Sequence, residues 1–433
     1  MTNGQDILRA LTAQEEIYWR LTYNDQIHVI VAAETKGHVS VESWQHALIR
    51  LQHTNQILSS SIDMPSDDNS LLQPVFTKSL NVPIPLRLID RADFTLESEI
   101  EAELAIPFVE GQAPLCRLAL AHREDGATAI MSVSHSVGDG TTGLVLMRDL
   151  LRGVGGVEAL PAPVTSTAPA VLGVASVPPT RRIIDGEPKR SPNAGRRPTV
   201  ALFQLDRERT EAIVTACRAR GSTVHSALAA ATVTELRRRW ADHASREITI
   251  ISPVDTRALL GLPDDAVGLY FTSPQSRYPA GSEDDFWAMA HLTRKDIAGA
   301  ATEDAVREVT KGMQAYTQAG LTNASANESL DSVFAMNVLL TNLGRTSFGA
   351  DFGDIRVERL WGPIVLGGRD HVQTIGVVTI EGKLHLAHIS REPVTDLLGA
   401  IVNILIDETK EFSKVAEPIC GPIAMKRTFH REP

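Results

Sequence analysis

The sequence predicts an α/β protein made of two halves, each of which combines strands with helices. The chain has 433 residues, of which 43% are hydrophobic, so it can bury the cores of two large domains or about three small ones. Segments with strand-like alternation and segments with helical spacing follow one another in both halves. A segment rich in Pro and Gly, residues 153–198, separates the halves.

In the first half, residues 7–20 are expected to form a short amphipathic helix with Thr12 as a cap. The clearest hairpin signal spans residues 113–135, where two apolar runs flank Asp125-Gly126, a pair that favours hairpin turns. The other expected elements are strands at 26–34 and 82–90 and helices at 40–62 and 141–154.

The second half shows the same mixture without a detectable sequence repeat. Residues 221–240 are expected to form a helix that Ser222 or Thr223 caps, because either hydroxyl can accept a hydrogen bond from a free N–H group. Residues 373–390 have the pattern of a hairpin with Glu381-Gly382 at its turn. The other expected elements are strands at 199–206, 247–257 and 266–279 and a helix at 284–300. After residue 300 we expect mostly strands.

The Pro- and Gly-rich segment sets the predicted domain boundaries. Its composition excludes regular structure, so we interpret residues 153–198 as a linker between a domain at 1–152 and a second domain at 199–433. The basic residues of this linker form either a solvated flexible face or a docking patch for an acidic carrier protein or a nucleotide phosphate.

Charge and cysteine content exclude several classes of protein. The net charge of −11 argues against nucleic acid as a partner, because phosphate binding needs a basic surface. The three cysteines Cys116, Cys217 and Cys420 have no disulfide or metal spacing, so we expect a reducing compartment. The first twenty residues are too polar for a secretory signal, and no apolar run reaches the roughly 20 residues of a membrane span. We therefore expect a cytoplasmic protein without a membrane span.

The stretch SVSHSVGDGTTG, residues 132–143, carries the strongest candidate for a catalytic residue. Side chains alternate along the strand before it, so His135 ends an apolar row and Ser134 faces the other side. A histidine in such a poorly hydrated place can act as a general base, and we expect its pKa to lie near neutrality. On the residues alone, a structural histidine in a tight turn is the alternative.

Other kinds of chemistry lack their residue patterns. A metal site on His135 and Asp139 has no third ligand at a familiar spacing, so no metal is expected. No serine lies in a Gly-x-Ser-x-Gly pattern, which argues against a serine hydrolase. His385 and His388 fall on opposite faces of their strand, and we interpret both as structural.

Several motifs, in order along the chain, resemble one known superfamily. SHSVGDG at 134–140 is similar to the His-His-x-x-x-Asp-Gly signature of condensation domains of nonribosomal peptide synthetases, polyketide-associated acyltransferases and chloramphenicol acetyltransferase. LTAQEEIYW resembles the start of the polyketide-associated acyltransferases, and FVEGQAPLCRLALA resembles the segment before the signature. SPVDTR, VGLYFTSPQSR and LLTNLGR resemble motifs of the second half, so the likeness spans most of residues 7–390.

This resemblance implies a fold and a set of roles. It implies two chloramphenicol-acetyltransferase-like domains, each an α+β sandwich, arranged in a V with a tunnel between them, in which a thioester donor and an acceptor meet. His135 would deprotonate the acceptor for direct attack on the thioester, without an acyl-enzyme. Asp139 would be architectural and form an ion pair with Arg257, and Gly140 would leave room for the pantetheine arm of the donor.

Two further features follow from the resemblance. Thr341 and Asn342 correspond to a segment beside the tunnel, where a hydroxyl or amide can donate to the oxyanion; a turn-stabilising Asn before Gly is the alternative. Ser134 stands where the signature has its first histidine, which changes the hydrogen bonding behind His135 and casts doubt on full activity.

The implied function is O-acylation of a polyketide or another lipophilic natural product in secondary metabolite biosynthesis. The donor would be acyl-CoA or an acyl carrier protein, the acceptor a hydroxylated small molecule, and no cofactor would stay bound. We expect a monomer. The alternatives are an amide-forming condensation enzyme and a non-catalytic member that binds carrier proteins, which Ser134 would favour.

Overall fold

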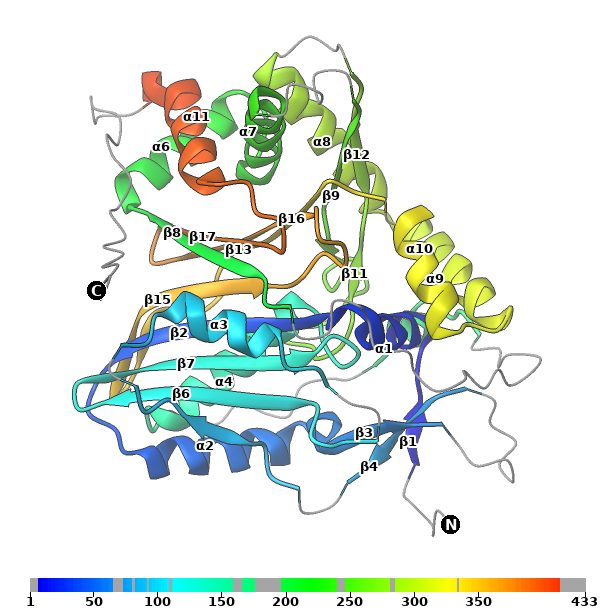
Figure 1. Ribbon diagram of the computed structural model, residues 1–433, viewed down its shortest axis with the longest axis vertical. Helices are drawn as coiled ribbons and strands as arrows, with labels where there is room; N and C mark the ends of the chain where they lie inside the picture. Colours follow the sequence, from blue (N-terminus) through cyan, green and yellow to red (C-terminus); the bar gives the residue numbers. More distant parts are fainter. Residues whose placement is uncertain are drawn as a thin grey trace, which may run out of the picture.

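Two six-stranded sheets form the framework of the protein in a computed structural model (Figure 1). The structure describes residues 7–64, 73–79, 82–91, 93–108, 111–158, 166–175, 196–239, 246–280, 285–332 and 335–412. The first sheet has the strand order β14-β15-β2-β7-β6-β5, and the second has the order β12-β9-β13-β16-β17-β8. The predicted mixed α/β architecture is confirmed.

The strands of the first sheet are β2 (His28–Lys36), β5 (Leu86–Leu88), β6 (Cys116–Arg123), β7 (Gly126–Ser134), β14 (Asp351–Phe352) and β15 (Ile355–Ile364). The strands of the second sheet are β8 (Thr199–Leu205), β9 (Ile248–Ile251), β12 (Gln275–Tyr278), β13 (Val338–Arg345), β16 (Gln373–Ile380) and β17 (Lys383–Ser390). A small sheet joins β1 (Ile7–Ala10), β4 (Val75–Lys78) and β3 (Ser60–Asp63), and a two-stranded ribbon joins β10 (Val254–Asp255) and β11 (Phe271–Thr272).

Helices cover the outer face of each sheet (Figure 1). On the first sheet, α2 (Val41–Thr54) and α4 (Gly140–Val154) pack on one face, and α3 (Leu96–Leu104) packs on the other. The second sheet is covered by α6 (Arg207–Ala219), α7 (Val224–Arg239), α8 (Phe286–Ala300) and α11 (Leu397–Thr409). The remaining helices are α1 (Ala13–Asp25), α5 (Ala168–Val171), α9 (Glu303–Gln318), α10 (Asn323–Ser332) and the short 3-10 helices at Gln56–Ser59 and Lys410–Phe412.

A shared core joins the two sheets. Ile30 and Ile130 of the first sheet belong to the same buried cluster as Ala387 and Ile389 of the second. The strand β15, which comes from the second half of the sequence, pairs antiparallel with β2 of the first sheet. The two halves of the chain are therefore interlocked as well as packed together.

The predicted domain boundaries stay a prediction, because residues 159–165, 176–195 and 413–433 lie outside the described residues. The described part of the predicted linker holds the end of α4 and the short helix α5. Cys420 also lies outside the described part of the chain.

Several expectations about secondary structure need correction. The helix expected at 40–62 ends at Thr54, and Ser60–Asp63 form the strand β3. The predicted linker, whose composition was expected to exclude regular structure, contains the short helix α5. Residues 7–10 form a strand, and the first helix begins only after Thr12, whose side chain and that of Glu15 form a capping box. The hairpin turn consists of Glu124 and Asp125, while Gly126 already pairs in β7. The helices α9, α10 and α11 occupy part of the region that was expected to be mostly strands.

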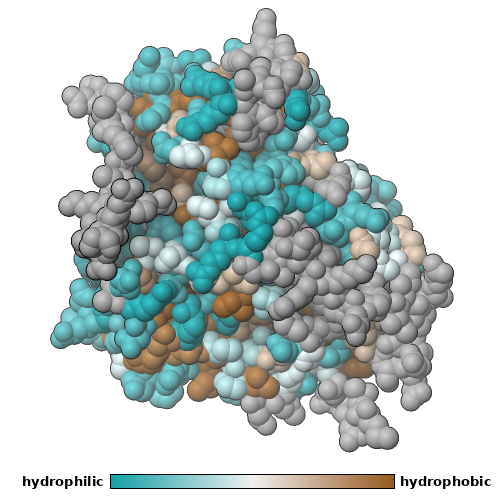
Figure 2. All heavy atoms as spheres, viewed as in Figure 1, coloured by the Kyte–Doolittle hydropathy of each residue, from teal (hydrophilic) through white to brown (hydrophobic). Residues whose placement is uncertain are grey.

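The surface shown in Figure 2 is mostly hydrophilic, with small hydrophobic patches. In the described residues, no helix combines the length and hydropathy that a membrane crossing requires.

Candidate active site

A cavity of about 410 Å³ is lined by residues from both halves of the chain. The helix α1 contributes Tyr18, the loop after β7 contributes His135, and the start of α4 contributes Gly140. The strands β13 and β11 contribute Leu339 and Phe271. Because the wall is shared between distant segments, the cavity forms only when both halves are folded together.

His135 follows the last residue of β7 and lies at the wall of this cavity. The alternation predicted for the strand is observed: Met131 and Val133 face the core under α4, while Ile130 faces the opposite core. His135 is 8% exposed, and its ring stacks on Tyr18 with centroids 4.2 Å apart and planes at 25°. The ring of Phe271 lies 5.8 Å away on the same site.

Burial lowers the pKa of His135 to about 4, although the charge of Asp139 acts in the opposite direction. The expectation of a pKa near neutrality was therefore too high, because removal of water disfavours the charged imidazolium more than the neighbouring carboxylate favours it. At neutral pH the imidazole is uncharged. It can accept a proton, as a general base must.

Both carboxylate oxygens of Asp139 accept hydrogen bonds. Its side chain caps α4 by accepting a hydrogen bond from Thr142 N at 2.8 Å, and Tyr270 N donates to its other oxygen at 2.9 Å. Arg257 donates to both carboxylate oxygens, at 2.9 and 3.0 Å. With burial opposing it, this positive charge and these hydrogen bonds keep the pKa of Asp139 below its usual range.

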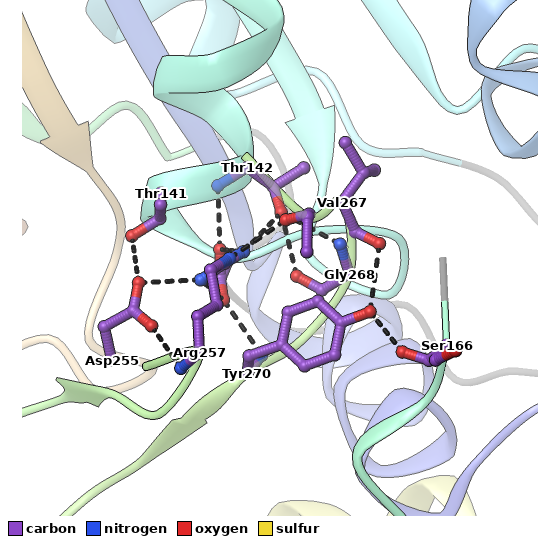
Figure 3. A network of polar contacts seen from close by, with 10 residues as sticks. Thr141, Thr142, Ser166, Asp255, Arg257, Val267, Gly268 and Tyr270 are labelled. Carbon is purple, nitrogen blue, oxygen red and sulfur yellow. Dashed lines mark hydrogen bonds and ion pairs between the residues drawn. The ribbon is translucent and has the colours of Figure 1, made fainter. Parts of the chain in front are cut away.

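Arg257 is the centre of this polar network (Figure 3). It is 1% exposed, and it donates to Ala266 O at 2.9 Å and to Asp255 Oδ2 at 2.7 Å in addition to Asp139. Its guanidinium also lies 4.8 Å from the centre of the Tyr270 ring. The network joins the start of α4 in the first half to the β10–β11 ribbon in the second half.

Gly140 is placed where a side chain would not fit. A Cβ atom there would lie 3.0 Å from Pro363 Cβ and 3.1 Å from Leu343 Cδ2. The glycine therefore allows β13 and β15 to approach the start of α4 closely, and the space beside it is filled by these two side chains. A role in making room for a pantetheine arm stays a prediction.

Thr341 and Asn342 both line the cavity from β13. The Asn342 side-chain oxygen accepts a hydrogen bond from Gly344 N at 2.7 Å, the arrangement of the turn-stabilising alternative. Ser134 is 3% exposed, lies opposite His28 in the sheet and is not part of the cavity wall. Its hydroxyl accepts a hydrogen bond from Ser136 N at 3.4 Å.

The two histidines interpreted as structural lie in the core of the second sheet. His385 packs edge-on against Trp361, and His388 Nε2 lies 2.9 Å from Gln373 Oε1. Among the described residues, no group of three or more His, Cys, Asp or Glu side chains is placed to hold a metal ion.

Tyr18 and Phe271 are site residues that sequence reasoning missed. Both lie within motifs that carried the resemblance, but nothing in a single sequence indicates that α1 and β11 meet at His135. Gln14 Nε2 donates to Phe271 O at 3.3 Å and fastens these two segments together. Only the tertiary structure reveals this contact.

The comparisons with known proteins agree with this fold. A family model described as the C-terminus of phthiocerol/phthiodiolone dimycocerosyl transferase matches residues 194–348. Polyketide synthase associated protein 5 from Mycobacterium tuberculosis has a TM-score of 0.62 and 18% identity, with 94% of this chain and 100% of that chain covered. A comparison with curated protein sequences gives no match.

Two further solved structures share the fold. The first condensation domain of the CDA synthetase has a TM-score of 0.66 and 16% identity, with 94% of this chain and 97% of that chain covered. A protein from F. graminearum in complex with coenzyme A and T-2 mycotoxin has a TM-score of 0.60 and 12% identity, with coverages of 89% and 95%. These solved structures thus show the fold that the resemblance implies, and the family model matches residues 194–348 of the chain.

Proposed function

We propose that this protein is an acyltransferase that moves an acyl group from a thioester to a hydroxyl of a polyketide or another lipophilic natural product. The observation that carries the proposal is an uncharged His135 at the wall of a cavity shared by both halves of the chain. Asp139 and Arg257 hold the loop that presents this histidine.

In the proposed reaction, His135 accepts the proton of the acceptor hydroxyl while that oxygen attacks the thioester carbonyl. The tetrahedral intermediate then collapses, the carbon–sulfur bond breaks, and the thiolate leaves and takes the proton from the imidazolium. The thiols of Cys116 and Cys217 are buried, which raises the pKa of each to about 12, so neither supplies a thiolate for an acyl-enzyme. Neither of the two cysteines in the described part of the chain thus favours an acyl-enzyme, and we propose direct transfer between the two substrates.

The names of the similar proteins support the choice of substrates. The matching family model names a dimycocerosyl transferase, and one similar structure is a polyketide synthase associated protein. Another similar structure holds coenzyme A together with a mycotoxin. The condensation domain among them favours the second candidate, in which an amine replaces the hydroxyl and the product is an amide.

A basic end of the cavity suits a phosphopantetheine donor. Arg345 borders both this cavity and a neighbouring one of about 430 Å³, to which α6 contributes Arg207 and Arg218 beside Glu211. Arg345 follows Thr341 on β13 beyond a bulge between Asn342 and Arg345, and the two residues pair with positions three residues apart on β16, about 10 Å at roughly 3.3 Å per residue. A phosphate at these arginines, from CoA or from an acyl carrier protein, would leave an extended pantetheine arm reaching into the cavity.

The function is tested by release of free thiol and by mass spectrometry of the products, with a panel of acyl-CoAs, an acylated carrier protein, and hydroxyl and amine acceptors. We expect an ester, and we expect the His135→Ala variant to lose about 10²-fold or more of the rate, the usual scale for a general base. The exposed His46 serves as control, because His46→Ala removes a histidine far from the cavity lining.

Other outcomes of this experiment are equally informative. An amide product with amine acceptors would favour the condensation enzyme. Binding of a carrier protein without turnover above the His135→Ala background would favour the non-catalytic member. Full activity in the His135→Ala variant would remove this histidine from the mechanism.

The donor is tested separately with acetyl-CoA and acetylpantetheine, which lacks the phosphates. We expect Arg345→Ala to raise the KM for acetyl-CoA about tenfold, the scale of one lost charged hydrogen bond, and to leave the KM for acetylpantetheine unchanged. Arg220→Ala is the control, because this exposed arginine lines neither cavity and pairs with Glu411. An equal loss with both donors would contradict a phosphate contact.

A further inference from the structure

We propose that Tyr18 is a positioning residue that holds the imidazole of His135 and stabilises its protonated form during acyl transfer. This inference rests on the proposed function, since it gives Tyr18 a role in the step that His135 carries out. The observation behind it is the parallel stack of the two rings, with centroids 4.2 Å apart and planes at 25°.

Protonated His135 needs stabilisation because the imidazole is buried away from water. Burial lowers the pKa of His135 to about 4, so the imidazolium that forms when the acceptor loses its proton is costly. Asp139 is the neighbouring carboxylate, but both of its oxygens already bind the guanidinium of Arg257, which offsets its charge. The electron-rich face of an aromatic ring attracts a cation that lies over it, and Tyr18 presents that face to the imidazole.

The ring of Tyr18 is itself rigidly held. The helix α1 is fixed at its start by the Thr12 capping box and by Arg9, which donates to both carboxylate oxygens of Glu15 at 2.7 Å. Phe271 makes an edge-to-face contact with the Tyr18 ring, with centroids 5.7 Å apart, and its centroid lies 5.8 Å from that of the imidazole, so Phe271 packs against both stacked rings. Burial raises the pKa of Tyr18, and the phenol therefore stays neutral. The contacts with Tyr18 and Phe271 therefore restrict rotation of the imidazole.

The test compares Tyr18→Leu, which removes the ring, with Tyr18→Phe, which keeps it. We expect Tyr18→Leu to lower kcat about tenfold with KM within about twofold, because the stack acts on the imidazolium and not on substrate binding. Tyr18→Phe should have the same kcat as the wild type. The control Tyr316→Leu removes another aromatic ring from the same hydrophobic cluster, on α9, and should leave kcat unchanged.

A second readout does not depend on activity. Long-range proton–nitrogen NMR at neutral pH reports the tautomer and order of His135, whose signal is assigned by its loss in His135→Ala. We expect one sharp signal in the wild type and in Tyr18→Phe, and a broadened or split signal in Tyr18→Leu. Thermal unfolding of each variant shows whether the protein is still folded.

The two proposals fail in different ways. If the wild type turns over no thioester, the proposed function fails, while the NMR comparison still tests the hold of Tyr18 on His135. If the wild type is active but Tyr18→Leu keeps the wild-type kcat, or keeps the wild-type NMR signal, the role of Tyr18 is refuted. An equal loss of kcat in Tyr18→Phe and Tyr18→Leu would also refute the proposed role of the Tyr18 ring, because the hydroxyl and not the ring would then matter.

Discussion

The carboxylate of Asp139 and the guanidinium of Arg257 are both almost fully buried, and Arg257 provides the positive charge that compensates Asp139. The side chains are 6% and 2% exposed, and they meet in a two-pronged contact. Removing one partner of a buried pair leaves an unpaired charge, which costs about 3–5 kcal/mol. The pair is therefore a structural clamp on the loop that carries His135.

We predict that Arg257→Ala lowers both the free energy of unfolding, by about 3–5 kcal/mol, and the rate of acyl transfer. Urea unfolding measures the first quantity, and thiol release measures the second. Arg257→Lys keeps the charge but loses the planar fork, so it should fall between the wild type and the alanine variant. Lost activity with unchanged unfolding would contradict the structural role.

At this scale, part of the site could be read from the sequence and part could not. Alternation along one strand distinguishes His135 from Ser134, because a period of two follows from local backbone geometry. The depressed pKa of His135 and its stack on Tyr18 depend on segments that lie far apart in the sequence. No local pattern determines either of them.

At the scale of elements, the sequence of α9 contains signals that predict a helix. The helix α9 begins at Thr302, whose side chain accepts a hydrogen bond from Ala305 N, and has Glu303 and Asp304 in its first turn. Val306, Met313 and other apolar residues recur at helical spacing behind this cap. These are ordinary signals of a helix start, and the expectation of strands is wrong over Glu303–Gln318.

The hairpin turn shows a different kind of limit. Asp125-Gly126 was expected at the turn because glycine accepts positive φ, but Gly126 pairs with Lys36 in the sheet. A Cβ atom there would lie 2.1 Å from the carbonyl oxygen of Thr35. The glycine is thus required by the close approach of a neighbouring strand, which a local turn rule does not consider.

At the scale of the whole molecule, the same contacts that build the site also join the two halves. Thr142 Oγ1 donates to Gly268 O at 2.8 Å, and Thr141 Oγ1 donates to Asp255 Oδ2 at the same distance. Together with the Asp139–Arg257 pair, these bonds fasten the start of α4 to the second half (Figure 3). Because the cavity lies at this junction, loss of global stability and loss of the site should occur together.

Buried histidines give this molecule a specific response to acid. Burial lowers the pKa of five of them to about 3 or about 4: His28, His135, His225, His385 and His388. In the unfolded chain a histidine has a pKa of about 6.5, so between that value and about 4 the unfolded state binds more protons than the folded state. The free energy of unfolding must therefore fall as the pH falls through this range.

We predict that the protein loses stability steeply between about pH 6.5 and pH 4, by about 1.4 kcal/mol per pH unit for each of these histidines. Urea unfolding at a series of pH values from 7.5 downward measures the slope. His385 is buried against Trp361, so His385→Phe, which removes one of the five buried histidines, should reduce the slope by about 1.4 kcal/mol per pH unit. The control is His46→Ala, which removes an exposed histidine and should leave the slope unchanged. A stability that stays flat from pH 7 to pH 5 would show that the five buried histidines are hydrated in the folded protein.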